Sequence, residues 1–253
     1  MSGNAGVTHR WEEHTSTQLA HRLAADPDCV ALIPVGATEQ HGPHLPVGTD
    51  TILAAAVADA AAGDIALVLP PIAFGSSMFH GSAMAGTVAF SGEDTAATAY
   101  RVARACVDSG VRRVMFVNGH VGNAAALWIA CDHFRRDLPR ARIGVMQWWD
   151  LTADIARRAT ADALDWHANA AETSLMMAVR PELVDVEAMA RADDPDRTEG
   201  LVFRYPVGSV STNGVTGHPS RASESFGIEL WGDVVIAARD VVSRAHVEQP
   251  PLS

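Results

Sequence analysis

Basic residues are scarce in this chain. Its 253 residues include 19 Lys and Arg against 30 Asp and Glu, which gives a formal net charge of −11 at pH 7. Binding to nucleic-acid phosphates depends on a surface rich in Lys and Arg, so a strongly acidic chain is repelled by them. We therefore expect no nucleic acid among its partners.

Long apolar runs and paired cysteines are missing too. The apolar stretches are interrupted well before the roughly 20 residues that span a bilayer, and no basic amphipathic stretch indicates a membrane surface. Residues Met1–Arg10 lack the apolar core of an export signal. The three cysteines, Cys29, Cys106 and Cys131, fit no CxxC pattern and are typical of reduced, buried thiols. The sequence predicts no membrane partner and a cytoplasmic location.

What the chain does have is an alternation of short β-rich runs and helical patterns, with 48% hydrophobic residues to fill a core. This rhythm predicts an α/β fold: three α/β/α layers around a mainly parallel sheet, in a single domain of residues 1–253. The expected strands are Val30–Gly36, Ile65–Leu69, Thr87–Phe90, Val111–Val117 and Ile143–Gln147. The expected helices are Thr51–Ala62, Thr95–Ser109, Asn123–Leu138, one that ends near Ala178, and Glu224–His246.

The most informative segment follows the first expected strand. Residues 36–50 read GATEQHGPHLPVGTD and place Glu39, His41 and Asp50 at the end of an apolar run. Glu39 and His41 are two residues apart, so in extended backbone their side chains leave the same side. Carboxylates and imidazole are ligands of zinc, manganese or iron, which favours half of a divalent-metal site. The structural alternative makes Asp50 a helix cap and the other two solvated loop residues.

Two later segments add candidates. His120 follows an expected strand at the turn into the next helix, where α/β folds place ligand groups, although a structural histidine is the alternative. His167 is expected in a loop, five residues before Glu172. The helix dipole accounts for a carboxylate in the first turn of a helix. The functional alternative makes Glu172 a general acid or base beside a metal.

Together the three segments resemble the creatininase family of metal-dependent amidohydrolases, which also contains the mycofactocin-maturing peptidase and a formamide hydrolase of flavin biosynthesis. The resemblance spans roughly residues 30 to 240. The matching segments are Glu39-x-His41 with Asp50, then Asn118-Gly119-His120, and then His167 through Glu172-Thr173-Ser174. The resemblance implies a creatininase-like fold, hydrolysis of an amide-type C–N bond and a homo-oligomer, since family members are commonly hexamers.

The resemblance also implies one or two divalent ions per chain. Asp50 would bridge two metals, with Glu39 and His120 on one and His41 on the other. Creatininase itself has a glutamate two residues after the second-segment histidine, where this chain has Gly122. That departure argues against creatinine as the substrate. It leaves the second metal with Glu172, with additional water, or only weakly bound.

Residues beside these segments are candidates for substrate contacts. The family often has a Glu-His pair in the loop after the second expected strand. Here Phe79 stands where that glutamate is usual and His80 is kept, in a loop that is one residue longer, which makes the contacts more apolar. Trp148 and Trp149 follow an expected strand, where adjacent side chains point opposite ways. At most one of them is expected in the core, and the other lines the substrate pocket, as tryptophans do in creatininase.

The predicted function is hydrolysis of a small-molecule cyclic amide, lactam or formamide by a metal-activated water. His167 is the expected catalytic imidazole that protonates the leaving nitrogen, oriented by Glu172. The first alternative is a peptidase that trims a modified precursor peptide, as the mycofactocin relative does. The second is a non-catalytic binding protein on the same fold. The presence of the whole set of candidate ligands argues against this second alternative.

Overall fold

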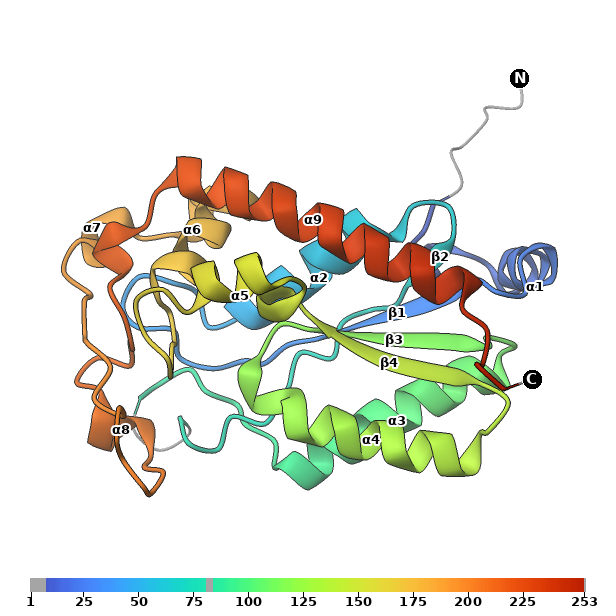
Figure 1. The fold of residues 1–253 in the computed structure, drawn as a ribbon, viewed down its shortest axis with the longest axis horizontal. Coiled ribbons are helices and arrows are strands. Elements are labelled where there is room, and N and C mark those ends of the chain that lie inside the picture. Colours follow the sequence, from blue (N-terminus) through green and yellow to red (C-terminus); the bar gives the residue numbers. More distant parts are fainter. Residues whose placement is uncertain (1–7, 81–83, 253) are drawn as a thin grey trace.

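The computed structural model describes residues 8–80 and 84–252. Four parallel strands form its sheet, in the order β2-β1-β3-β4 (Figure 1). They are β1 (Val30–Val35), β2 (Ala66–Val68), β3 (Arg113–Asn118) and β4 (Arg142–Gln147). β1 and β3 pair over six residues, so their carboxyl ends meet at the same edge. The α/β prediction with a parallel sheet is confirmed.

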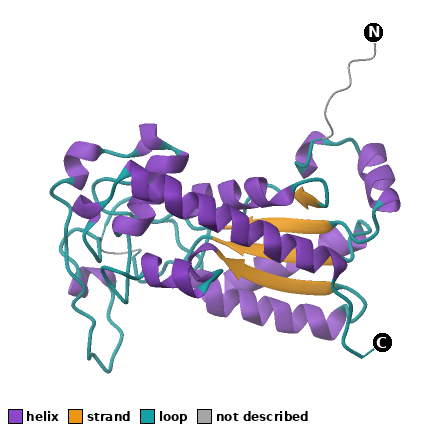
Figure 2. Cartoon of the chain, turned by 45° about the horizontal axis from the view of Figure 1, so that its top comes forward, coloured by secondary structure: helices purple, strands orange, loops and turns teal. Residues whose placement is uncertain are grey.

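Helices cover both faces of the sheet, which confirms the three-layer expectation (Figures 1 and 2). Successive residues of β1 serve opposite faces: Leu32 packs with one buried cluster and Ile33 with the other. One layer contains α2 (Thr49–Ala62), α5 (Ala153–Ala159), α6 (Ala170–Val179) and α9 (Glu224–Val247). The other contains α3 (Gly92–Asp108) and α4 (Ala124–Asp137), with α1 (Ser16–Ala25) beside it.

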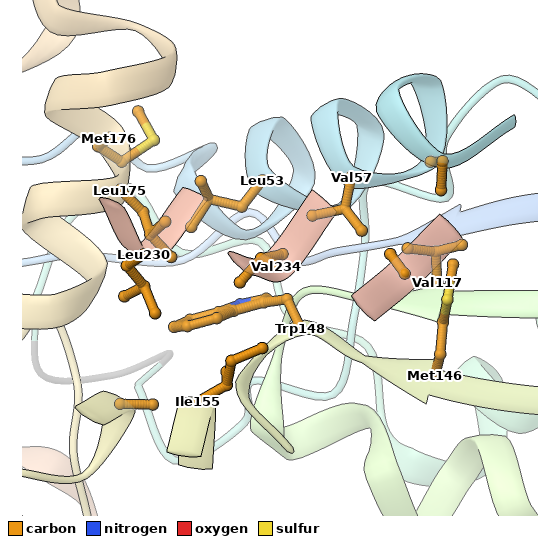
Figure 3. Packing of buried hydrophobic residues seen from close by; sticks show 14 of the residues in the cluster. Leu53, Val57, Val117, Met146, Trp148, Ile155, Leu175, Met176, Leu230 and Val234 are labelled. Atoms are coloured by element: carbon orange, nitrogen blue, oxygen red, sulfur yellow. The ribbon is translucent and has the colours of Figure 1, made fainter. Parts of the chain in front are cut away.

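Trp148 anchors the first of these layers. Its indole lies between Val234 of α9 and Ile155 of α5, with Leu53 of α2 nearby (Figure 3). The side chain is 1% exposed, and burial of an aromatic of this size contributes several kcal/mol of hydrophobic stabilisation, of the order of 3. This packing fixes α2 and α6 relative to the sheet, and both helices begin at the edge where β1 and β3 end.

The region between β2 and α3 departs from expectation. No strand forms at Thr87–Phe90 in the described chain; Phe90 makes an isolated bridge with Ser76, and the Val88 N–H donates to the carbonyl of Thr38 at 2.8 Å. Its partners are loop residues rather than a strand, so no ladder extends. The loop that the sequence predicts to be one residue longer includes residues 81–83, which lie outside the described residues.

The remaining elements within residues 8–80 and 84–252 are short. They are α7 (Val186–Met189), α8 (Val207–Val210) and five 3-10 turns: Trp11–Glu13, Val121–Asn123, Trp148–Asp150, Pro181–Leu183 and Pro219–Arg221. None of the helices in the described ranges is both long and apolar enough to cross a bilayer.

Candidate metal centre

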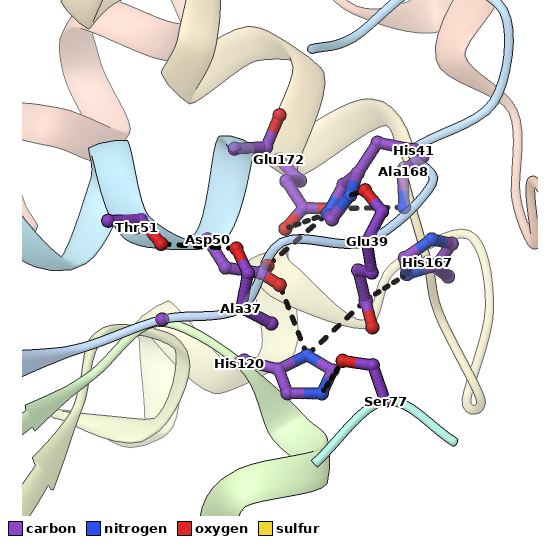
Figure 4. Close-up of polar contacts among 12 residues, drawn as sticks. Ala37, Glu39, His41, Asp50, Thr51, Ser77, His120, His167, Ala168 and Glu172 are labelled. Carbon is purple, nitrogen blue, oxygen red and sulfur yellow. Dashed lines mark hydrogen bonds and ion pairs between the residues drawn. The ribbon is translucent and has the colours of Figure 1, made fainter. Parts of the chain in front are cut away.

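The loop after β1 supplies the first candidates. This 36–48 loop carries Glu39 and His41, whose side chains are buried, and it leads directly into α2. Gly48, rather than Asp50, takes the N-cap position, so Asp50 lies inside the first helical turn. Its side chain therefore does not cap the helix. It points back towards the loop, as Figure 4 shows.

The other candidates come from the ends of β3 and the start of α6. The backbone N–H of His120 donates to Asn118 Oδ1 at 3.1 Å, which holds the turn after β3. At α6, Asn169 Oδ1 caps the helix by accepting from the Glu172 N–H at 3.0 Å. Glu172 Oε2 accepts from the Ala168 N–H at 2.8 Å, which turns its other oxygen towards the site. Glu172 thus occupies the predicted first turn.

These side chains converge on Asp50 (Figure 4). His120 Nδ1 is 3.3 Å from Glu39 Oε1 and 3.2 Å from Asp50 Oδ2. His41 Nε2 is 3.2 Å from Asp50 Oδ1 and 3.7 Å from Glu172 Oε1. The two oxygens of Asp50 therefore face different histidines. Two triads share this aspartate: Glu39–Asp50–His120 and His41–Asp50–Glu172, each with its donor atoms within 4.8 Å of one another.

Several of the oxygen and nitrogen atoms that could bind a metal in this cluster are buried without a hydrogen-bond partner in the described chain. They are both carboxylate oxygens of Glu39, Asp50 Oδ2 and His41 Nε2. A buried polar atom without a hydrogen bond is costly, and most such atoms in proteins are paired. Carboxylate and imidazole donors in this arrangement fit divalent ions of the zinc, manganese or iron type.

The pKa values of the cluster also show that its buried carboxylates favour a positive charge beside them. Burial lowers the pKa of His120, but the carboxylates of Glu39 and Asp50 outweigh it and raise the pKa to about 9. The pKa of His41 is likewise raised, because Asp50 and Glu172 outweigh burial. Burial raises the pKa of Glu39 to about 6. Protons on the two histidines thus balance the carboxylates in the absence of an ion, and metal binding would release them.

His167 lies beside the cluster with a different environment. Its Nε2 is 2.7 Å from the carbonyl oxygen of Gln40, and its Nδ1 is 3.5 Å from Glu39 Oε1. Its ring packs against those of His41 and His80 in a tilted arrangement, at centroid distances of 4.4 and 4.5 Å and interplanar angles of 47° and 50°. Burial and the neighbouring His41 and His80 hold the pKa of His167 well below its usual range. It is therefore a neutral imidazole next to the candidate ligands.

A cavity of about 870 Å³ opens beside the cluster and reaches Asp50, His120 and Glu172. Its walls include Phe79 and His80, the two loop residues that the sequence offers as candidates for substrate contacts. Much of the rest comes from an irregular stretch, residues 198–206, here called the 198–206 segment. The described lining residues include Phe79, His80, Val121, Leu164, Trp166, Leu201, Val202, Phe203, Arg204 and Tyr205.

Trp148 and Trp149 are not among the described residues that line this cavity. The chain leaves β4 as a 3-10 turn rather than as extended backbone, and this turn directs Trp148 into the core. Trp149 packs edge-on against Trp148 and Trp166, with ring centroids 5.9 Å from each. Trp166 is the tryptophan that reaches the cavity. Its position directly before His167 is the sequence signal that indicates this tryptophan.

Comparisons with known proteins agree with this geometry. The family model described as creatinine amidohydrolase matches residues 12–242. A mycofactocin precursor peptide peptidase of Mycobacterium ulcerans (strain Agy99) is 35% identical over 225 residues, covering 84% of this chain and 83% of the relative. A creatinine amidohydrolase of Pseudomonas putida is 32% identical over 218 residues, covering 80% and 81%.

A solved structure agrees as well. A crystal structure of creatinine amidohydrolase superposes with a TM-score of 0.84 at 30% identity, covering 96% of this chain and 99% of the other. The family model spans most of the chain, and both relatives exceed 30% identity over at least four-fifths of it. The chain belongs to the creatininase family of metal-dependent amidohydrolases.

Proposed function

We propose that this chain hydrolyses an amide-type C–N bond of a cyclic amide, lactam or formamide, at a centre of one or two divalent ions. The observation that carries the proposal is the buried Asp50, shared by two triads whose donor atoms include several without hydrogen bonds. Protons on His41 and His120 can balance the carboxylates without an ion, whereas a bound ion would also give the buried atoms that lack hydrogen bonds a partner. The proposal takes residues 1–253 as one catalytic domain.

The donor set divides naturally between two ions. Glu39 and His120 would hold one, and His41 and Glu172 the other, with Asp50 between them. A divalent ion in such a site lowers the pKa of a water ligand and polarises a carbonyl group. Related creatininase structures are described as a Zn–Zn type and as a manganese form, which supports zinc or manganese; the donor types also suit iron.

Glu172 takes the place of the glutamate that creatininase has at the Gly122 position. A Cβ at Gly122 would overlap His120 Nε2 and the carbonyl oxygen of Ser76, so this backbone leaves no room for a side chain. The Glu172 carboxylate instead reaches the second triad from α6, held by the Ala168 N–H. This different origin of the second carboxylate supports a substrate other than creatinine.

Side chains of this protein would carry out the proton transfers of the reaction. His167 Nδ1 faces the cluster while its Nε2–H is held by the carbonyl of Gln40, so Nδ1 carries the free lone pair. It would accept the proton that the attacking water loses and pass it to the leaving nitrogen. The expected orientation of His167 by Glu172 is not what supports this role: Glu172, fixed by the Ala168 N–H, lies beside His41, and the Gln40 carbonyl orients His167.

Peptide hydrolysis is the second candidate, favoured by the size of the cavity. About 870 Å³ lies near the top of the range for sites that hold a drug-sized ligand, far more than a small lactam fills. Its rim carries exposed apolar side chains, among them Val202 and Phe203. A relative that is 35% identical is a peptidase of a precursor peptide.

Elemental analysis tests the proposal directly. We expect protein purified without chelator or added metal to contain about one or two divalent ions per chain. A panel of lactams, N-formyl compounds and short peptides with apolar ends then separates the two candidate activities. A protein without metal, which also takes up none on dialysis against zinc or manganese, would overturn the hydrolase proposal and favour a binding protein.

Location and assembly complete the proposal. A cytoplasmic location is supported by the three cysteines, which are buried free thiols. We also propose a homo-oligomer, hexameric by resemblance to the family. Size-exclusion chromatography with light scattering tests this assembly.

A further inference from the structure

Gln40 lies between two candidate ligands, and the proposed chemistry gives its side chain no role. The residue is 4% exposed, and both ends of its amide are hydrogen-bonded. Gln40 Nε2 donates to the carbonyl oxygen of Gly214 at 3.0 Å and to His80 Nδ1 at 2.9 Å. Gln40 Oε1 accepts from the Gly42 N–H at 2.9 Å.

These partners fix which end of the amide is which. Rotating the amide by 180° would place its oxygen against the Gly214 carbonyl and its NH2 against the Gly42 N–H, which loses both hydrogen bonds. Gly214 has φ +88°, and a Cβ there would overlap the Gln40 amide. The backbone therefore packs directly on this side chain and leaves it one orientation.

The orientation of Gln40 sets the tautomer of His80. An amide NH2 only donates, so His80 Nδ1 must accept and the ring proton must be on Nε2. His80 lines the cavity, and within the described part of the chain no group hydrogen-bonds to its Nε2. Among residues 8–80 and 84–252, nothing thus occupies the Nε2–H donor of His80.

The backbone of Gln40 fixes the tautomer of the neighbouring His167, with the acceptor rather than the donor left free. Its carbonyl accepts from His167 Nε2 at 2.7 Å, which leaves the lone pair of His167 on Nδ1. The His80 and His167 rings are 4.5 Å apart. Gln40 therefore contacts two neighbouring imidazoles beside the candidate metal ligands, and it leaves one with a free donor and the other with a free acceptor.

From this juxtaposition we propose that Gln40 is a positioning residue that keeps His80 as a hydrogen-bond donor to an oxygen atom of the substrate amide. The inference rests on the proposed amide hydrolysis for the identity of that oxygen. The substrate class follows: it must offer an acceptor oxygen, such as a carbonyl, next to the bond that is cleaved. A purely structural Gln40 would join the loops without controlling the His80 proton.

The tautomer can be measured without a substrate. In zinc-loaded protein with ¹⁵N-labelled histidine, we expect an unprotonated Nδ1 and a protonated Nε2 for His80, whose signal the His80→Gln variant identifies. Gln40→Glu replaces the donor by an acceptor, so Nδ1 of His80 should gain a proton. A protonated Nδ1 in the wild-type protein would overturn the inference, as would an unchanged tautomer in Gln40→Glu. If that variant does not fold, Gln40→Met removes the donor without adding charge, and the wild-type measurement still decides.

The donor itself can be tested with acetohydroxamate, a chelating amide analogue with a carbonyl oxygen. The amide nitrogen of Gln superposes on His Nε2 and that of Asn on Nδ1, so His80→Gln and His80→Asn form a matched pair. By titration calorimetry on zinc-loaded protein, we expect Kd to rise by less than about threefold in His80→Gln and by about tenfold in His80→Asn. Equal Kd values in the wild type and both variants would overturn the donor role.

Failure of this inference can be told apart from failure of the proposed function. Zinc content is measured on the same samples. A wild-type protein that binds no zinc would contradict the proposed metal centre. The ¹⁵N pattern of His80 in metal-free protein would then still decide whether Gln40 controls its proton.

Discussion

Two stretches of chain belong to the site, and they differ greatly in burial: the 36–48 loop carries candidate ligands, and the 198–206 segment lines the cavity. The part of the 36–48 loop that carries the candidate ligands is buried: Glu39, Gln40 and His41 are at most 4% exposed. Its His44 is hydrogen-bonded through Nε2 to Thr173 Oγ1 of α6 at 2.8 Å. The 198–206 segment has Val202 90% and Phe203 73% exposed.

The difference separates chemistry from recognition. Donor atoms that must lie within a few tenths of an ångström of their working positions need a packed and hydrogen-bonded support, which the 36–48 loop has. Exposed apolar side chains at the mouth of a cavity are typical of a surface that binds something. We therefore expect changes in the loop to affect metal and turnover, and changes in the segment to affect the choice of substrate.

Asp50→Asn tests the role of the ligand cluster that the 36–48 loop supports, and we expect it to have the largest effect. The amide keeps the shape but removes the negative charge shared by both triads, so metal affinity should fall by more than the roughly 100-fold that loss of an outer partner costs. Activity should be lost with it. Elemental analysis, circular dichroism and turnover measure the three effects. The matched control is Asp59→Asn on the same helix, where the carboxylate pairs with Arg10, and full metal content and activity in Asp50→Asn would refute the centre.

His167→Ala should have a smaller and more selective effect. Loss of a general acid or base costs typically 10²- to 10⁴-fold in kcat, while the shared Asp50 cluster keeps its donors. We expect normal metal content and a fall of that size in turnover, with exposed His133→Ala as the control. Glu39, His41 and His167 also lie within ligand reach of one another. Loss of metal in His167→Ala would therefore move this histidine into the ligand set.

Local patterns predicted most of the fold because they report on burial within one element. β1 is a continuous apolar run, and it is buried along its whole length between two layers. The expected strand at Thr87–Phe90 had the right composition, but a strand exists only if a neighbour pairs with it, and here the neighbours are loop residues. Pairing is a tertiary property that one segment cannot indicate.

The candidate site divides in the same way. Glu39, His41 and Asp50 could be predicted together because they are close in sequence and follow one strand. The part played by Gln40 could not, since it depends on the carbonyl of Gly214, 174 residues further along the chain. The place of Trp148 was hidden for a related reason: a 3-10 turn at the end of β4 decides which indole enters the core.

Phe203→Ser tests the role of the 198–206 segment in substrate choice, and we expect the smallest effect from it. The side chain is largely exposed, so the free energy of unfolding should change by no more than about 0.5 kcal/mol. Metal content should not change, because the segment supplies none of the candidate ligands. If Phe203 contacts the substrate, kcat/KM for apolar peptides should fall by about 5- to 10-fold through KM, which corresponds to losing part of one buried side chain.

The control for this last prediction is Ile236→Ser, an equally apolar change at an exposed position of α9, away from the cavity. It should leave kcat/KM unchanged for every substrate of the panel. A loss for peptides in Phe203→Ser with no loss for lactams would show that the segment selects large substrates, and would favour the peptidase. Equal losses for both would mean that the segment supports the site as a whole, and the proposed division between chemistry and recognition would fail.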